Sequence, residues 1–237
     1  MNPPAKDLSK IASSDKVKKV QKDFEATHVR PERLMKTLFT DEAYVKANVD
    51  EARLMRRLFD LACNMQSHDT DMQLYSLFTD EECYDLWSCN NLYWYLTHAC
   101  SPVTDGLMPY READLLRNIL DRADAALKEG KKQATLRFGH ESCLLPLVAL
   151  LELNHYGESY PDVEKLSEQW RAYDIFPMAS NVQFVFFHKK GSNDVLVKVL
   201  LNEKETKLPV KTDVAPYYHW KDVESYYREK LDKYQHI

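Results

Sequence analysis

Residues 134–151 read ATLRFGHESCLLPLVALL, and this stretch decides the fold expected for the whole chain. A short apolar run ends at Gly139, then come His140 and Glu141, and an apolar helical pattern begins at once. This order is typical of a buried strand over 134–138, a sharp turn and a helix. In open α/β folds, ligands bind beyond the carboxyl ends of such strands. There the N-terminus of the next helix points its free N–H groups and the positive end of its dipole at the ligand. We therefore expect His140 and Glu141 to face an anion, with phosphate as the first candidate.

Taken by itself, a Gly-His-Glu corner is more often a simple turn than a binding site. Its surroundings are more specific, because LRFGHE at 136–141 followed by LLPL at 144–147 resembles the second signature of the histidine acid phosphatases. The resemblance is closest to the branch of the phytases and multiple inositol polyphosphate phosphatases, and it extends to PMASN at 177–181. In that family the histidine binds phosphate, and an acidic residue just after it protonates the leaving group. The resemblance therefore implies that His140 binds a phosphate or inositol phosphate substrate and that no cofactor takes part.

The position of the acid varies within that family. Some members place it directly after the histidine, at the position of Glu141, whereas the inositol polyphosphate phosphatases have His-Ala-Glu and place it at the position of Ser142. A serine cannot replace a carboxylic acid as the proton donor, so we expect Glu141 to be the catalytic acid. Two further residues are candidates for substrate binding. Arg137 either contacts phosphate or forms a structural salt bridge, and Asn181 either braces the site or caps the start of a strand.

The first signature of the family, an Arg-His-Gly loop that carries the nucleophilic histidine, is not found in this sequence. None of the eight histidines follows an arginine or precedes a glycine. HDT at 68–70 is interpreted as a loop between helices, and THVRP at 27–31 as the start of a helix. Since a phosphohistidine mechanism needs its nucleophile among arginines, we expect this chain to be a C-terminal portion with negligible turnover alone. The alternative is a non-catalytic relic or a phosphate-binding module.

The composition excludes several other classes of protein. The 237 residues are 44% hydrophobic and 29% charged, with a net charge of −5 that argues against a nucleic-acid partner. No apolar run reaches the roughly 18 residues of a membrane span. The N-terminus does not read as a secretion signal, although the family is commonly periplasmic or secreted, so the compartment stays open. The five cysteines have no Cys-x-x-Cys spacing, and we expect no metal site.

The predicted fold class is α/β but mostly helical. We expect helices from Pro31, over 49–65, from Thr79 and over 113–127, a hairpin of 181–187 with 195–201, and a last helix over 222–234. By the resemblance, residues 1–130 are a helical, insert-like domain, and residues 131–237 are the C-terminal part of a histidine-phosphatase-like α/β domain. A strand at 134–138 without its usual neighbour exposes an edge. We therefore expect a homodimer, a missing N-terminal half, or an edge covered by the chain's own first residues.

Overall fold

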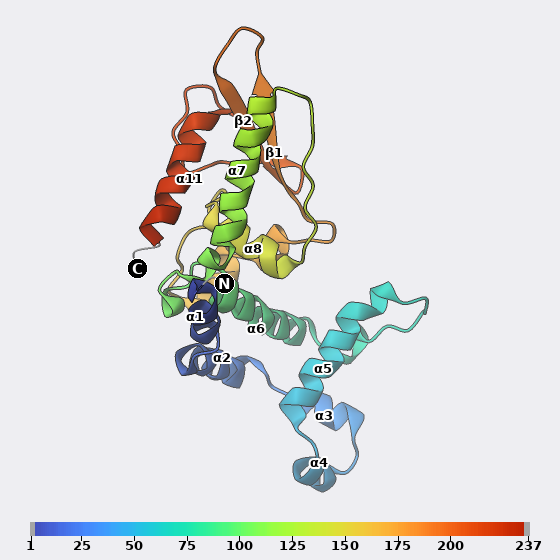
Figure 1. Cartoon of the computed structure of the whole chain (residues 1–237). Helices are drawn as coiled ribbons and strands as arrows, with labels where there is room; N and C mark the ends of the chain where they lie inside the picture. The colour runs from blue at the N-terminus through green and yellow to red at the C-terminus, as the bar shows by residue number, and fades with distance from the viewer. Residues whose placement is uncertain (1–2, 235–237) are drawn as a thin grey trace. The chain divides into compact units, whose positions relative to one another are not determined.

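The computed structural model describes residues 3–234, which form two compact units (Figure 1). The helical unit comprises residues 15–93, and the sheet unit comprises the residues up to 14 together with those from 94 onward. The boundary expected near Gly130 therefore falls inside the sheet unit. The assignment of residues 1–130 to a helical domain stays a prediction from the resemblance.

The helical unit contains helices that enclose a small apolar core. Its elements are α2 (Asp15–His28), α3 (Glu32–Leu38), α4 (Glu42–Asn48), α5 (Glu51–Asn64), the short 3₁₀ helices η1 (Met65–Ser67) and η2 (Tyr75–Leu77), and the larger part of α6 (Asp80–His98). Leu34, Met55 and Leu86 are among the buried residues that pack together there. The helices predicted from Pro31 and over 49–65 are confirmed, and His68 lies in an exposed loop as expected.

The start of α6 has the capping box that the sequence predicts. The backbone N–H of Thr79 donates to Glu82 Oε2 at 2.9 Å, and the N–H of Glu82 donates to Thr79 Oγ1 at 3.2 Å. Arg33 of α3 forms an ion pair with the same Glu82 carboxylate at 2.5 Å. Burial alone would raise the pKa of Glu82, but the hydrogen bonds from Arg33 and Thr79 prevail and lower it. This contact therefore joins α3 to the first turn of α6.

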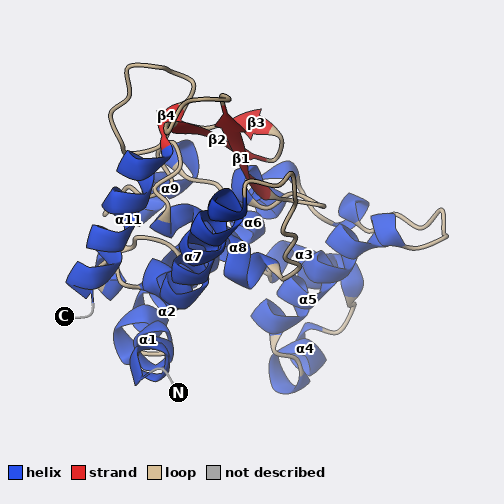
Figure 2. Ribbon diagram, turned by 45° about the horizontal axis from the view of Figure 1, so that its top comes forward, coloured by secondary structure: helices blue, strands red, loops and turns tan. Residues whose placement is uncertain are grey.

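The sheet unit combines helices with a small antiparallel sheet (Figure 2). Its helices are α1 (Pro3–Ala12), the end of α6, η3 (Pro102–Thr104), η4 (Met108–Glu112), α7 (Ala113–Glu129), α8 (Glu141–Leu150), η5 (Val163–Lys165), α9 (Leu166–Gln169), α10 (Ala172–Ile175) and α11 (Trp220–Tyr234). Its strands are β1 (Val182–His188), β2 (Val195–Leu201), β3 (Lys204–Glu205) and β4 (Tyr218–His219). The predicted hairpin and last helix are confirmed, and α7 ends at Gly130 with φ 65°, as its glycine predicts.

Strand β2 is the centre of the sheet. It pairs with β1 along its whole length on one side, and on the other side with β3 and β4 at two separate places. Among the described strands, β1 has a neighbour on one edge only. The alternating residues Val197, Val199 and Leu201 of β2 are buried, which is the period-two pattern of a sheet with one covered face.

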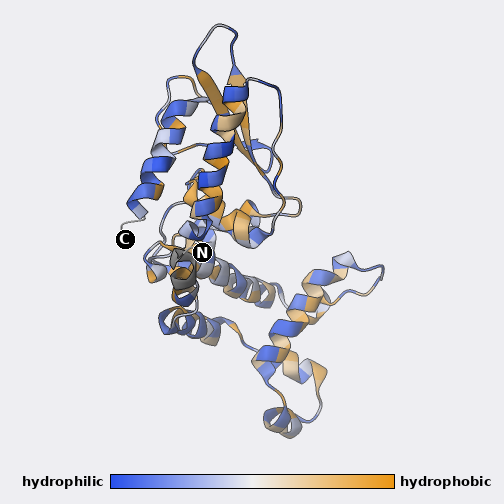
Figure 3. Cartoon of the chain, in the orientation of Figure 1, coloured by the Kyte–Doolittle hydropathy of each residue, from blue (hydrophilic) through white to orange (hydrophobic). Residues whose placement is uncertain are grey.

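Helix α8 supplies much of the core of the sheet unit. All six residues from 145 to 150 are buried, and the helix is largely apolar (Figure 3). Tyr227 of α11 is fully buried and donates a hydrogen bond of 2.7 Å to the carbonyl of Leu151 at the end of α8. The Lys230 ammonium donates to the carbonyl of Leu150 at 2.7 Å. These bonds satisfy carbonyls that a helix end leaves without partners inside the helix.

The prediction of a strand over residues 134–138 is wrong. Residues 131–140 form no regular structure and are exposed, with Leu136 75% and Phe138 94% accessible. In both views this segment descends on the side of β1 that faces away from β2 (Figures 1 and 2). A strand requires a partner for its backbone N–H and C=O groups, and no described strand pairs with this segment. Residues 3–12 do not cover it either, because they form α1, which packs near η4.

Candidate functional site

The turn at 139–141 places His140 at the N-cap of α8. His140 has extended backbone angles (φ −107°, ψ 165°), and its carbonyl accepts the N–H groups of Cys143 at 3.0 Å and Leu144 at 3.1 Å. Its side chain makes no capping hydrogen bond and is exposed. The imidazole therefore stands beside the positive end of an α-helix, where a bound anion is favoured. The predicted corner is present, although no strand leads into it.

Gly139 leaves the approach to this corner open. A Cβ atom added to Gly139 would meet no other atom within 4 Å. The backbone there does not need glycine for its own packing. Space for the close approach of a ligand is thus available next to His140, which is one of the uses of glycine at binding sites.

Glu141 is the first residue of α8, and its side chain is exposed. A carboxylate in the first turn of a helix is stabilised by the helix dipole. Arg137 lies three residues before His140, and its guanidinium donates a hydrogen bond of 2.8 Å to the Asn118 side chain of α7. This bond is neither the carboxylate salt bridge nor the phosphate contact considered from sequence. It ties the exposed segment to α7 just before the turn.

Asn181 lies immediately before β1 and makes local hydrogen bonds. Its backbone N–H donates to Asn202 Oδ1 at 3.1 Å, and its side-chain amide donates to the carbonyl of Ala179 at 3.2 Å. Its side-chain oxygen accepts from Gln183 at 2.9 Å. These bonds fit the alternative of a strand cap, and no described bond joins Asn181 to the residues around His140. Its role in substrate binding stays a prediction.

Three residues that the sequence did not single out lie near the first turn of α8. Burial lowers the pKa of His98, at the end of α6, to about 4, and the charge of Arg111 lowers it further while Glu141 opposes both. Burial raises the pKa of Glu112, which hydrogen-bonds to the Cys143 thiol. Their positions, 28 to 42 residues before His140, gave no signal in the sequence. Arg111 and Glu112 come near because η4 packs against α8. His98 is therefore neutral at pH 7, and Arg111 is a fixed positive charge beside the site.

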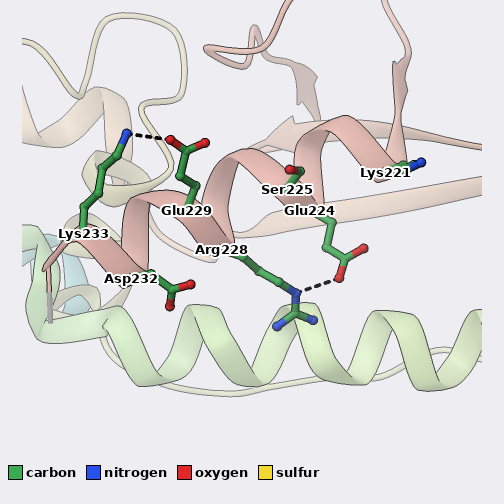
Figure 4. A pocket seen from close by; sticks show the side chains of 7 residues that line it. All are labelled: Lys221, Glu224, Ser225, Arg228, Glu229, Asp232 and Lys233. Carbon is green, nitrogen blue, oxygen red and sulfur yellow. Dashed lines mark hydrogen bonds and ion pairs between the residues drawn. The ribbon is translucent and has the colours of Figure 1, made fainter.

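Two hollows on the described surface do not have His140 in their lining. One, of about 690 Å³, is lined by α11, and its ion pairs are Glu224 with Arg228 and Glu229 with Lys233 (Figure 4). The other, of about 330 Å³, includes Glu152 and Lys230, which form an ion pair at 3.1 Å. The residues of the His140 corner, 139–141, are exposed. Among the described residues, no group of three His, Cys, Asp or Glu side chains is placed to hold a metal ion, and no helix has the length and apolar character to cross a membrane.

The family described as "Histidine phosphatase superfamily (branch 2)" matches residues 2–202. The chain belongs to this family. The resemblance found in residues 136–147 is thereby confirmed at the level of the family.

Relatives of this chain include inositol polyphosphate phosphatases that are longer than it. Human multiple inositol polyphosphate phosphatase 1 is 28% identical over 134 residues, which cover 51% of this chain and 27% of that protein. The Bifidobacterium longum multiple inositol polyphosphate phosphatase in complex with inositol hexasulfate has a TM-score of 0.73 at 18% identity, over 94% of this chain and 56% of that one. Its complex with phosphate has a TM-score of 0.65 at 19% identity, over 98% and 56% of the two chains. The fold is therefore shared, and the chain spans about half of the solved relative.

Proposed function

We propose that this chain is the C-terminal part of a histidine phosphatase that hydrolyses phosphate monoesters such as inositol polyphosphates. The observation that carries the proposal is the exposed imidazole of His140 on the N-terminus of α8, in a chain of this family. His140 and the N–H groups of the first turn bind the transferring phosphate, and Glu141 protonates the leaving alcohol. Arg137 and Asn181 complete the substrate contacts. One solved relative, the Bifidobacterium longum multiple inositol polyphosphate phosphatase, has structures in complex with inositol hexasulfate and with phosphate, which supports this substrate class.

The nucleophilic histidine has to come from another segment, because no Arg-His-Gly occurs in this sequence. We place this nucleophile-bearing segment between residues 131–140 and the outer edge of β1. Both offer backbone groups without a strand partner among the described residues, so a strand between them would be paired on both sides. It would also cover Leu136 and Phe138.

The test is reconstitution of activity with an aryl phosphate or phytate as substrate. The chain is assayed alone and mixed with an N-terminal fragment of a homologue that carries Arg-His-Gly. Negligible turnover alone and turnover on mixing support the proposal, and His140→Ala should abolish the reconstituted activity. Turnover by the chain alone at the rate of the family would disprove the need for a second segment.

The second candidate is a non-catalytic phosphate-binding module, which the lack of an Arg-His-Gly loop favours. Calorimetric titration with phytate distinguishes the two functions. A site that consists of His140 and one helix end binds weakly, since few charges face the ligand. Weak binding that His140→Ala removes, with no turnover under any reconstitution, would favour the binding module.

A further inference from the structure

His219, outside the candidate site, lies between two carboxylates. Its Nδ1 is 3.0 Å from an oxygen of Asp194, and its Nε2 is 3.0 Å from an oxygen of Asp213. The three residues come from different segments of the sheet unit. Asp194 ends the turn before β2, His219 ends β4, and Asp213 lies in the connection from β3 to β4. One imidazole thus joins two loops to the sheet.

Both contacts together require a doubly protonated ring. An ionised carboxylate only accepts hydrogen bonds, and a neutral imidazole has a single N–H to donate. A neutral His219 would therefore donate to one carboxylate and turn a lone pair towards the other. The hydrogen bonds to Asp194 and then Asp213 accordingly raise the pKa of His219, and the same bond to His219 lowers the pKa of Asp213.

The other charged groups nearby do not make contact with the imidazole. Lys198 of β2 pairs with Glu205 at 2.8 Å and lies 5.4 Å from the centre of the Tyr217 ring. Leu196, the residue opposite His219 in the sheet, is apolar. The remaining charged residues close in sequence make no described contact with the ring; they are Lys189, Lys190, Lys211, Lys221 and Asp222.

The Asp213 contact holds the outer half of the connection. At its start, the N–H of Lys207 donates to Asn154 at 3.0 Å, and the N–H of Leu208 donates to the Tyr218 hydroxyl at 3.0 Å. In the rest of the connection, residues 209–216, the described side-chain hydrogen bonds stay within 212–217. The exception is the bond between His219 and Asp213. Among the described side-chain hydrogen bonds, that contact is the one that joins residues 209–216 to a strand of the sheet.

We propose that Asp194, His219 and Asp213 form a proton-operated latch that fastens residues 209–216 to the sheet while the imidazole carries two protons. When His219 loses the proton on Nε2, Asp213 loses its donor and the connection loosens. The folded protein holds the proton more tightly than the unfolded chain. The latch is therefore closed below the ordinary histidine pKa of about 6.5 and opens as the pH rises through the higher value in the folded protein. At strongly acid pH it opens again, when Asp213 takes up a proton.

The test combines ¹⁵N NMR of the histidine side chains with amide hydrogen exchange of the intact chain. At pH 6 both nitrogens of His219 should carry protons, and its titration should lie above the ordinary histidine value of about 6.5. Exchange in 209–216, corrected for its intrinsic pH dependence, should rise several-fold between pH 6 and pH 9. Asp213→Asn should give the fast exchange at both pH values.

His188→Gln serves as the matched control and should leave the pH response unchanged. Its ring contacts only a turn carbonyl, that of Ser192 at 2.7 Å, in the described structure. Asp213→Asn retains the Asp194 contact, so the variant does not depend on loss of the whole cluster. A single protonated nitrogen on His219 at pH 6, or equal protection of 209–216 at both pH values, would overturn the latch.

Discussion

The indole N–H of Trp220 donates a hydrogen bond of 2.8 Å to Asp124, which joins the first residue of α11 to α7. The second oxygen of the same carboxylate accepts a hydrogen bond, also of 2.8 Å, from the guanidinium of Arg228, which lies further along α11. Burial alone would raise the pKa of Asp124, yet these hydrogen bonds lower it. Asp124 therefore stays ionised and holds two turns of α11 to one position on α7.

Replacing Arg228 should weaken the attachment of α11 to α7. Arg228→Ala removes the contacts to Asp121 and Asp124 of α7 and to Glu224 of α11. Because the guanidinium is one-third exposed, we expect a loss of about 1 kcal/mol and a fall in Tm of about 2–4 °C in thermal unfolding. Arg122→Ala, at an exposed position of α7, is the control and should change Tm little. Equal effects of the two variants would show that the network adds nothing.

Gly157 should not tolerate a side chain. A Cβ there would lie 2.5 Å from Glu152 Cγ and 2.9 Å from Glu152 Cα, and the second of these is a backbone atom that cannot move alone. Overpacking of this kind costs about 1–3 kcal/mol, so Gly157→Ala should lower the denaturant midpoint clearly. Gly139→Ala is the matched control, because a Cβ there meets nothing and stability should be unchanged. A stable Gly157→Ala variant would mean that the loop at 152–157 adjusts easily.

The sequence predicted some features of this fold and not others. Caps, turns and periodic segments were predictable because their causes are local, as with the Thr79–Glu82 capping box and the Gly130 helix end. The irregular, exposed conformation of residues 134–138 was not predictable, because apolar residues indicate burial but do not identify the partner that would bury them. Arg111 could not be placed near His140 for a similar reason, since only the packing of η4 on α8 brings them together.

The helical unit should lose stability in acid through Glu82. Its pKa is lower in the folded protein than in the unfolded chain, so the stabilisation is present above the ordinary value of about 4.3 and is lost as the pH falls through the folded value. Glu82→Gln should therefore have a lower Tm than the unaltered chain at pH 7. Near pH 3 the Tm values of the two proteins should be closer together. Glu32→Gln, at an exposed position of α3, is the control and should follow the unaltered chain throughout.

The exposed ring of Phe138 should matter for association and not for stability. It is 94% accessible, so Phe138→Ser removes almost no buried area and Tm should stay unchanged. If residues 131–140 accept a strand from a second chain, the same change should weaken dimers in sedimentation or prevent reconstitution with an N-terminal fragment. Met178→Ser, at a side chain 97% accessible, is the control for general loss of exposed apolar surface. A monomer with Phe138 intact would exclude the homodimer.

The position of the catalytic acid can be tested by moving it one residue along α8. In the reconstituted enzyme, Glu141→Gln should lower kcat about 10²- to 10⁴-fold, because the leaving alcohol then departs without a proton donor. The double change Glu141→Ala with Ser142→Glu places the carboxyl where the His-Ala-Glu members of the family carry it and should restore part of the activity. Ser142→Ala is the control, since a hydroxyl at that position has no part in the proposed proton transfer. If Glu141→Gln retains full activity while Glu112→Gln loses it, the proton comes from η4 and the assignment of Glu141 is wrong. Glu112 is the appropriate rival, because its burial raises its pKa and its carboxyl lies against the same turn of α8 at Cys143.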